Sequence, residues 1–257
     1  MSAPGSAAPM LETVGLVKRF GGLAATDGVS LVVRRGETHA VIGPNGAGKT
    51  TLLAQLAGAL APDAGTIRYD GRDVTRLAPH QRAAIGFARS FQITSLLPAF
   101  TVLENAALAV QARSGSSFRF WRPVRDEQAL TDEAREVLRE VGIEALADRV
   151  ARELAHGEHR QIEMALALAT RPKLLLLDEP MAGMGPDESA RMVALLERVK
   201  RDHTIVLVEH DMDAVFRLAD RISVMVAGRI VATGSGEEIR ANAEVRSAYL
   251  GEEEAPA

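Results

Sequence analysis

The chain has 257 residues, 47% of them hydrophobic and 25% charged, with a formal net charge of -4. This length and apolar content allow one large α/β domain with a sizeable core, and the negative charge argues against a general electrostatic grip on nucleic acid, which needs clustered Lys and Arg. Cysteine is absent, which excludes disulfides and Cys-ligated metals and fits a reducing compartment.

The two ends of the sequence have the composition of tails. Residues 1–9 lack the basic start and the apolar segment of a secretion signal, so we expect a flexible N-terminal tail. Residues 251–257 are acidic, and we expect them to be solvated. No apolar run approaches the roughly 20 residues of a membrane-spanning helix. We therefore expect a soluble, cytoplasmic chain.

Strand-like segments of two kinds occur along the chain. Short apolar segments with Gly-containing turns are typical of an antiparallel layer. They are 13–20, 29–37, 66–74 and 222–234. Continuous apolar runs that end in polar residues suit parallel strands covered on both faces. They are 38–50, 173–179 and 204–211. Because such sheets bind ligands beyond the C-terminal ends of their strands, we expect the polar residues of these three runs to gather at one edge.

Helical patterns occupy the middle of the chain. Between residues 93 and 171, one apolar stripe comes before a second helix that starts near Gly157. The stripe consists of Leu130, Ala134, Leu138 and Val141. We interpret 93–171 as a helical subdomain inserted into an α/β core formed by 10–92 and 172–250.

A further helix is predicted between the last two apolar runs. Its apolar positions follow helical spacing. They are Met192, Leu195, Leu196 and Val199. Acidic Asp187 and Glu188 would occupy its first turn and basic Lys200 and Arg201 its last turn, as the helix dipole favours.

The segment "GPNGAGKT" at 43–50 matches the G-x-x-x-x-G-K-[ST] phosphate loop, with a strand before it and a helix after it. Its glycines let backbone amides converge on phosphate oxygens, Lys49 supplies a positive charge, and the Thr50 hydroxyl can bind magnesium. The predicted phosphate-binding residues are Gly43, Pro44, Asn45, Gly46, Ala47, Gly48, Lys49, Thr50 and Thr51.

Polar residues after the other two apolar runs complete the predicted site. Asp178 can hold the magnesium shell, and Glu179 can orient and deprotonate a water molecule for attack on a γ-phosphate. His210 closes its strand at the same edge, where it could contact that phosphate. Upstream, the turn "LAHGE" at 154–158 leads into a helix, an arrangement that presents free backbone N–H groups to an anion.

The order and spacing of these motifs resemble those of ATP-binding cassette (ABC) ATPases from about residue 10 to residue 250. The resemblance implies a P-loop NTPase (RecA-like) core, an antiparallel β layer, an inserted helical subdomain, and the cofactors ATP and Mg²⁺. It also implies a head-to-tail dimer in which the signature of one subunit caps the γ-phosphate held by the other. The signature residues would be Leu154, Ala155, His156, Gly157 and Glu158.

Two further roles come from the resemblance alone. Phe20 would stack on adenine, and Gln92 would link the γ-phosphate and Mg²⁺ to the helical subdomain. The usual signature LSGGQ is altered here at Ala155, His156 and Glu158, and Gly185 stands where many relatives carry Asp. Because a hydroxyl bond to a charged phosphate contributes about 1.5–3 kcal/mol, we expect a weakened cap that His156 partly compensates.

Longer stretches resemble the ATPase subunits of branched-chain amino acid importers. They are 19–31, 89–108, 171–189 and 206–234, and the loop at 113–130 resembles an extra loop of those subunits. This resemblance implies an energising subunit on the inner face of the cell membrane. Its partners would be a second ATPase subunit, identical or different, permease subunits and, indirectly, an external solute-binding protein, with no nucleic acid.

Other functions remain open at this point. Related ABC ATPases serve urea or amide uptake and lipopolysaccharide export, and share much of the pattern. A soluble non-transport ATPase or a regulatory ATP-binding subunit is a further alternative, although intact catalytic motifs favour hydrolysis.

Overall fold

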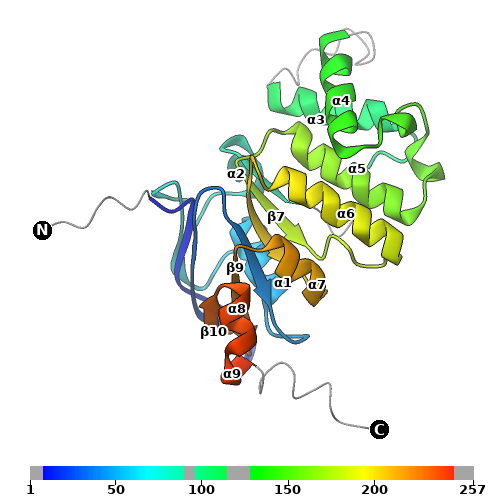
Figure 1. Ribbon diagram of the computed structural model, residues 1–257. Helices are drawn as coiled ribbons and strands as arrows, with labels where there is room; N and C mark the ends of the chain where they lie inside the picture. Colours follow the sequence, from blue (N-terminus) through cyan, green and yellow to red (C-terminus); the bar gives the residue numbers. More distant parts are fainter. Residues whose placement is uncertain (1–7, 90–95, 115–127, 246–257) are drawn as a thin grey trace, which may run out of the picture. The chain divides into compact units, whose positions relative to one another are not determined.

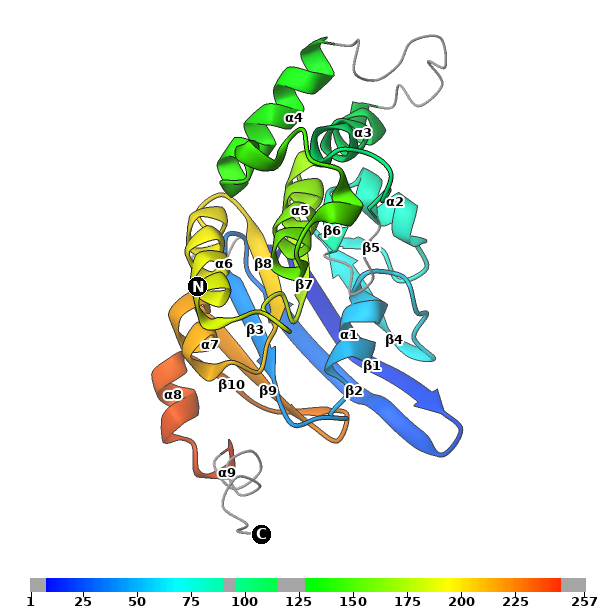
Figure 2. The ribbon, with the colours of Figure 1, turned by 90° about the vertical axis from the view of Figure 1, so that its right-hand side faces the viewer.

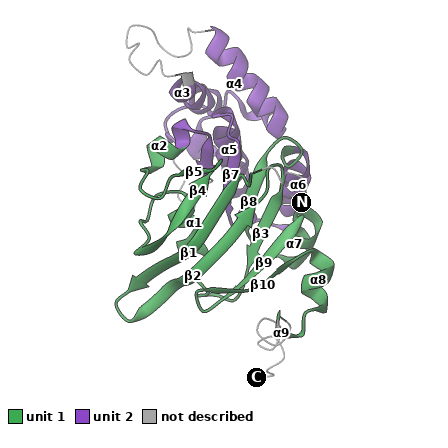
Figure 3. Cartoon of the chain, turned by 90° about the vertical axis from the view of Figure 1, so that its left-hand side faces the viewer, with its two compact units in different colours: residues 1–82, 199–257 green, residues 83–198 purple. Residues whose placement is uncertain are grey.

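The computed structural model describes residues 8–89, 96–114 and 128–245. The chain divides into two compact units, residues 1–82 with 199–257 and residues 83–198 (Figure 3). Outside the described ranges lie the N-terminal tail up to residue 7, Gln92, residues 115–127 and the C-terminal tail. The domain boundaries drawn from the sequence, at 93 and 171, stay a prediction.

An antiparallel sheet in the first unit has the strand order β2-β1-β4-β5. The strands are β1 (Leu11–Phe20), β2 (Leu23–Val33), β4 (Ala64–Tyr69) and β5 (Arg72–Asp73). From Val29 to Val33 of β2, buried and exposed side chains alternate, as expected for a sheet with one covered face. The predicted antiparallel layer is therefore confirmed for its first three segments.

A second sheet in the same unit has the order β10-β9-β3-β8. The strands are β3 (Thr38–Ile42), β8 (Thr204–Val208), β9 (Arg221–Val226) and β10 (Arg229–Gly234). β3 runs parallel to both β8 and β9, and every residue of β3 and β8 is buried. Residues 222–234 form an antiparallel hairpin of β9 and β10, as their pattern predicted. Their placement in the first antiparallel layer was wrong, because β9 also pairs in parallel with β3 and so joins the second sheet.

Helices of the first unit cover this sheet. α7 (Met212–Leu218), α8 (Gly236–Ala241) and α9 (Ala243–Val245) contribute Val215, Ile239 and Val245 to a core cluster with β3 and β9 (Figure 2). α1 (Lys49–Leu56) follows β3. It ends at Leu56, because Gly58 shortly after it adopts a left-handed φ of 76°.

The second unit combines two strands with a group of helices. β6 (Phe87–Arg89) and β7 (Leu174–Asp178) pair in parallel. α3 (Val102–Ser114), α4 (Gln128–Val141) and α5 (His156–Ala169) contact one another (Figure 1). The remaining helical segments are two short 3₁₀ turns (Glu144–Leu146 and Ala151–Glu153) and α6 (Pro186–Val199), and α2 (Pro79–Ala84) spans the unit boundary.

Two predicted helices are observed with small differences. In α4 the stripe residues Ala134, Leu138 and Val141 are buried. α6 ends at Val199, so Lys200 lies beyond the helix, where its Nζ donates to the carbonyl oxygen of Leu218 at 2.8 Å. Within the described ranges, no helix combines the length and apolar character needed to cross a bilayer.

Candidate functional site: a phosphate loop and two strand ends

The loop from Gly43 to Thr50 joins the buried strand β3 to α1. Gly48, the residue before α1, has a left-handed φ of 105°, and a side chain there would collide with the carbonyl oxygen of Ala25. Gly43 is equally restricted, because a side chain would collide with the carbonyl oxygen of Met225. Both glycines are therefore required by the close approach of β2 and β9 to the loop.

The start of α1 has the features of an anion site. No side chain caps it, and its first turn contains no acidic residue. The first N–H groups of a helix lack intrahelical partners and carry a partial positive charge. Lys49 adds a full charge at this point, with its side chain buried and its Nζ donating to the carbonyl oxygens of Gly43 and Pro44 at 2.6 and 2.9 Å. These residues fit the phosphates of a nucleotide.

A turn outside the phosphate-binding motifs supports this loop. Between β9 and β10, Ala227 and Gly228 have φ values of 45° and 81°. The N–H of Gly228 donates to the carbonyl oxygen of Ala47 at 2.9 Å, and its carbonyl oxygen accepts from the N–H of Asp27 at 2.8 Å. Arg229 binds the Asp27 carboxylate, which lowers the pKa of Asp27. The turn thus connects the phosphate loop to β2.

Phe20 and His210 are both accessible in the first unit. Phe20 ends β1 with 52% of its surface exposed, and Nζ of Lys18 lies 5.9 Å from its ring. His210 follows β8, the neighbour of β3 in the parallel sheet, and its side chain is 62% exposed. Its backbone N–H donates to the buried carboxylate of Glu209 at 2.8 Å. The polar ends of β3 and β8, two of the three runs expected to meet, thus lie at one sheet edge.

The acid pair lies in the second unit, at the end of β7. Asp178 is buried, and its Oδ2 lies 3.1 Å from Nη2 of Arg89 at the end of β6. Glu179 has a left-handed φ of 48°, which is uncommon for a residue other than glycine and typical of functional sites. Arg89 was absent from the predicted site, and only its position at the end of an adjacent strand could have indicated it. Gln92 lies outside the described residues.

The signature segment forms the start of α5. Leu154 is buried, and Ala155 stands at the N-cap position without a side-chain hydrogen bond. Glu158 compensates in part, because its Oε2 accepts the N–H of Ala155 at 2.8 Å. Nε2 of His156 lies beside Gly183. The role of these residues on a partner nucleotide stays a prediction.

Gly157 of the signature is closely surrounded within the second unit. A side chain at Gly157 would collide with the carboxylate of Glu188, whose Oε2 also accepts the N–H of Gly185 at 3.2 Å. The Glu188 carboxylate therefore lies between the start of α5 and the loop after β7, a contact that no local pattern predicts.

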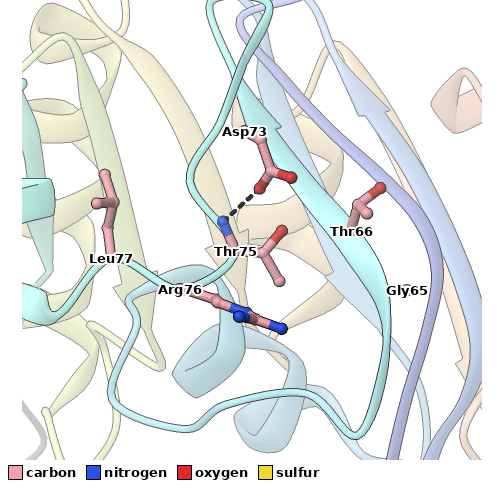
Figure 4. A pocket seen from close by; sticks show the side chains of 6 residues that line it. All are labelled: Gly65, Thr66, Asp73, Thr75, Arg76 and Leu77. Carbon is pink, nitrogen blue, oxygen red and sulfur yellow. Dashed lines mark hydrogen bonds between the residues drawn. The ribbon is translucent and has the colours of Figure 1, made fainter.

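A separate depression of about 410 Å³ lies in the antiparallel layer (Figure 4). Its lining residues are Gly65, Thr66, Asp73, Thr75, Arg76 and Leu77. Oδ1 of Asp73 accepts the N–H of Thr75 at 2.8 Å, which satisfies that carboxylate locally. The depression contains none of the predicted site residues.

Comparison with known proteins identifies the family. The family model described as ABC transporter matches residues 26–182, which include the phosphate loop and the Asp178–Glu179 pair. The chain belongs to the ABC transporter family. As an ABC ATPase it binds nucleotide. A second model, described as branched-chain amino acid ATP-binding cassette transporter, matches residues 229–255 of this ABC protein.

Curated relatives match nearly the whole ABC chain. The high-affinity branched-chain amino acid transport ATP-binding protein BraF of Pseudomonas aeruginosa is 40% identical, with 95% of this chain and 98% of that protein covered. LivG of Escherichia coli, described in the same words, is 39% identical with the same coverage.

Solved structures confirm the fold. An ATP-binding cassette in its ADP conformation has a TM-score of 0.82 at 32% identity, covering 95% of this chain and 99% of that chain. A nucleotide-free cassette from an ABC transporter has a TM-score of 0.81 at 32% identity, covering 92% of this chain and 97% of that chain. The predicted α/β P-loop NTPase fold with an antiparallel layer is therefore confirmed.

Proposed function

We propose that this ABC protein is the ATP-hydrolysing subunit that energises an importer of branched-chain amino acids. The observation that carries the proposal is the start of α1, which follows the glycine-rich phosphate loop and has no side-chain cap. Nζ of Lys49 donates to the carbonyl oxygen of Gly43 in that loop and so places a positive charge there. The match of residues 229–255 and the names of the relatives support the choice of substrate class. They favour it over urea, amide or lipopolysaccharide systems.

The residues of the first unit would hold the nucleotide. The amides of residues 43–51 and the charge of Lys49 would bind the phosphates, and the exposed ring of Phe20 would stack on adenine. His210, exposed at the end of the neighbouring strand, would contact the γ-phosphate. Thr50 is an exposed residue, and its hydroxyl is the kind of oxygen ligand that Mg²⁺ prefers.

The residues of the second unit would supply the chemistry. Asp178 offers a buried carboxylate as a further Mg²⁺ ligand, and Glu179 would orient and deprotonate the attacking water. Bound Mg²⁺ would neutralise charge on the phosphate oxygens. Gln92, outside the described residues, keeps its proposed role beside the γ-phosphate and metal.

Two subunits would cooperate in this reaction. The signature residues 154–158 of one subunit would cap the ATP held by another, with a cap weakened by the missing hydroxyl at Ala155. The partner ATPase would be identical or different, and permease subunits would hold both on the inner face of the membrane. An external solute-binding protein would deliver the amino acid to the permease.

The proposed base can be tested by replacing Glu179 with glutamine. We expect Glu179→Gln to bind ATP normally but to hydrolyse it at least ~10²-fold more slowly, the scale of a positioned general base. The measurements are ATP affinity by equilibrium binding and phosphate release under single-turnover conditions. Lys49→Ala is the contrasting variant, since it should lose binding itself. Near-normal hydrolysis by Glu179→Gln would refute the assignment of Glu179.

A further inference from the structure

A partly buried ion pair joins the ends of β6 and β7. Arg89 is the last residue of β6 and Asp178 the last of β7, and the two strands are parallel. Nη2 of Arg89 lies 3.1 Å from Oδ2 of Asp178, with side-chain exposures of 17% and 3%. A buried carboxylate requires a cationic partner. Asp178, the proposed metal ligand, is therefore paired with a positive charge from its own chain.

Arg82 is a useful comparison, because it is a buried arginine whose guanidinium is fully hydrogen-bonded. It is 1% exposed, and all three guanidinium nitrogens donate to backbone carbonyl oxygens. The acceptors are Gln55, Leu56, Val74, Thr75 and Leu77. Arg89 differs, because within the described residues its buried Nε has no hydrogen-bond partner. Since a buried donor without a partner is unfavourable, the guanidinium of Arg89 is held less completely than that of Arg82.

A guanidinium and a divalent cation bind a carboxylate through the same oxygens. Two cations on one buried carboxylate also repel each other, so binding of one weakens binding of the other. We propose that Arg89 is a resident counter-ion of Asp178, and that Asp178 exchanges this guanidinium for the metal ion that accompanies a bound nucleotide. This inference rests on the proposed function, because it takes Asp178 as a metal ligand. Arg89 is then a positioning residue that holds Asp178 at the strand end while the metal is absent.

If Arg89 competes with the metal for Asp178, the apparent metal affinity of the wild type is lower than that of a protein in which Asp178 has no competing cation. If Asp178 is released from Arg89 in one-fifth or less of the nucleotide-bound, metal-free molecules, the apparent affinity falls by about fivefold or more. Removal of the Arg89 charge should recover this factor. An arginine with a purely structural role would have no such effect, or would weaken metal binding by displacing Asp178.

The test measures binding of Mn²⁺, a probe for Mg²⁺, to the ADP-saturated full-length protein by electron paramagnetic resonance. Arg89→Gln should bind Mn²⁺ about fivefold or more tightly than the wild type, and Asp178→Asn should bind it more weakly. In the Asp178→Asn background, Arg89→Gln should bring no gain. The matched control is Arg160→Gln, which breaks an Arg160–Glu163 pair of similar length and burial, 3.0 Å with exposures of 13% and 7%, in the same unit. It should leave the Mn²⁺ affinity unchanged.

A second readout does not depend on metal titration. In the absence of metal and nucleotide, Arg89→Gln should lower the thermal unfolding midpoint, because it leaves the buried carboxylate unpaired. Saturating Mg²⁺ and ADP should reduce the difference from wild type. Arg89→Lys keeps the charge with fewer donors, so its Mn²⁺ affinity should lie between those of the wild type and Arg89→Gln. This variant allows the test if Arg89→Gln does not fold.

The outcomes distinguish the claim that Asp178 binds the metal from the claim that Arg89 competes with the metal for Asp178. If Asp178→Asn binds Mn²⁺ as tightly as wild type, the proposed metal role of Asp178 is wrong and the exchange with it. If Asp178→Asn binds more weakly but neither Arg89 variant binds more tightly than wild type, the exchange is wrong and the metal role stands.

Discussion

At the scale of single residues, Arg82 is a buried cation that forms no ion pair with a carboxylate of the described residues. Its guanidinium donates to the carbonyl oxygens of Gln55 and Leu56 at the end of α1, and to three more in the segment 74–77. Burial lowers the pKa of Arg82 to about 10, with Asp73 opposing the shift. A positive charge at a helix C-terminus is favourable. Arg82 therefore stabilises the helix that begins at the phosphate loop.

We predict that Arg82→Met lowers the free energy of unfolding by about 2–4 kcal/mol, because several buried carbonyl oxygens lose their donors. Urea unfolding followed by circular dichroism measures the change. Arg82→Lys keeps the charge but has fewer donors, so its free energy of unfolding should lie between those of the wild type and Arg82→Met. A loss below about 1 kcal/mol in Arg82→Met would show that water or a rearranged loop satisfies these carbonyls.

The altered signature gives a second prediction at this scale. Ala155 has the extended backbone of an N-cap residue, φ −70° and ψ 162°, and its methyl group accepts no hydrogen bond. Ala155→Ser should stabilise α5 by about 1 kcal/mol. It should also raise the ATPase rate by about ten- to 150-fold, reduced by whatever His156 already compensates, if the hydroxyl reaches a partner phosphate.

His156→Ala should lower the same ATPase rate if His156 compensates for the missing hydroxyl. Steady-state hydrolysis, normalised to the concentration of folded protein, measures both variants, and unfolding midpoints control for stability. An unchanged rate in both Ala155→Ser and His156→Ala would remove the compensating role of His156.

At the scale of elements, two hairpin turns of the first unit have nearly the same backbone but different surroundings. Asp70 and Gly71 have φ values of 49° and 75°, and Ala227 and Gly228 have 45° and 81°. A side chain at Gly71 would meet nothing within 4 Å, whereas one at Gly228 would lie 2.9 Å from the carbonyl oxygen of Ala24. The second turn therefore has a packing constraint that the first lacks.

This difference predicts the behaviour of two alanine variants. Gly71→Ala should cost about 1–2 kcal/mol of stability through its left-handed backbone alone and leave nucleotide affinity unchanged. Gly228→Ala should in addition weaken ADP binding by about tenfold, close to 1.4 kcal/mol, because the N–H of Gly228 that binds Ala47 would shift. Calorimetric titration with ADP compares the two. Equal affinities would mean that this turn does not support the phosphate loop.

Several of these elements could be predicted from local sequence, and others could not. Local sequence is enough to recognise the continuous apolar runs of β3 and β8. It is also enough to recognise the helical spacing of the apolar stripe in α4. The parallel pairing of β9 with β3 depends on partners more than 180 residues away, so its short segment could not be assigned to a sheet.

At the scale of the whole molecule, motifs predicted the family and most of the candidate site, because phosphate binding needs fixed residue types at fixed spacing. Arg89, Gly228 and Glu188 were missed, since each acts through a contact with residues far away in the sequence. The chain belongs to the ABC transporter family, and its relatives over 95% of its length are named as branched-chain amino acid transport proteins. The central claim is thus ATP-driven uptake of these amino acids.

The most direct measurement of this claim is uptake of radiolabelled leucine by cells of the source organism that lack the gene for this chain. We predict that wild-type protein restores energised leucine uptake, that Glu179→Gln at equal abundance does not, and that urea uptake is independent of both. Leucine uptake that stays unchanged when the gene is removed, or that Glu179→Gln restores fully, would contradict the account.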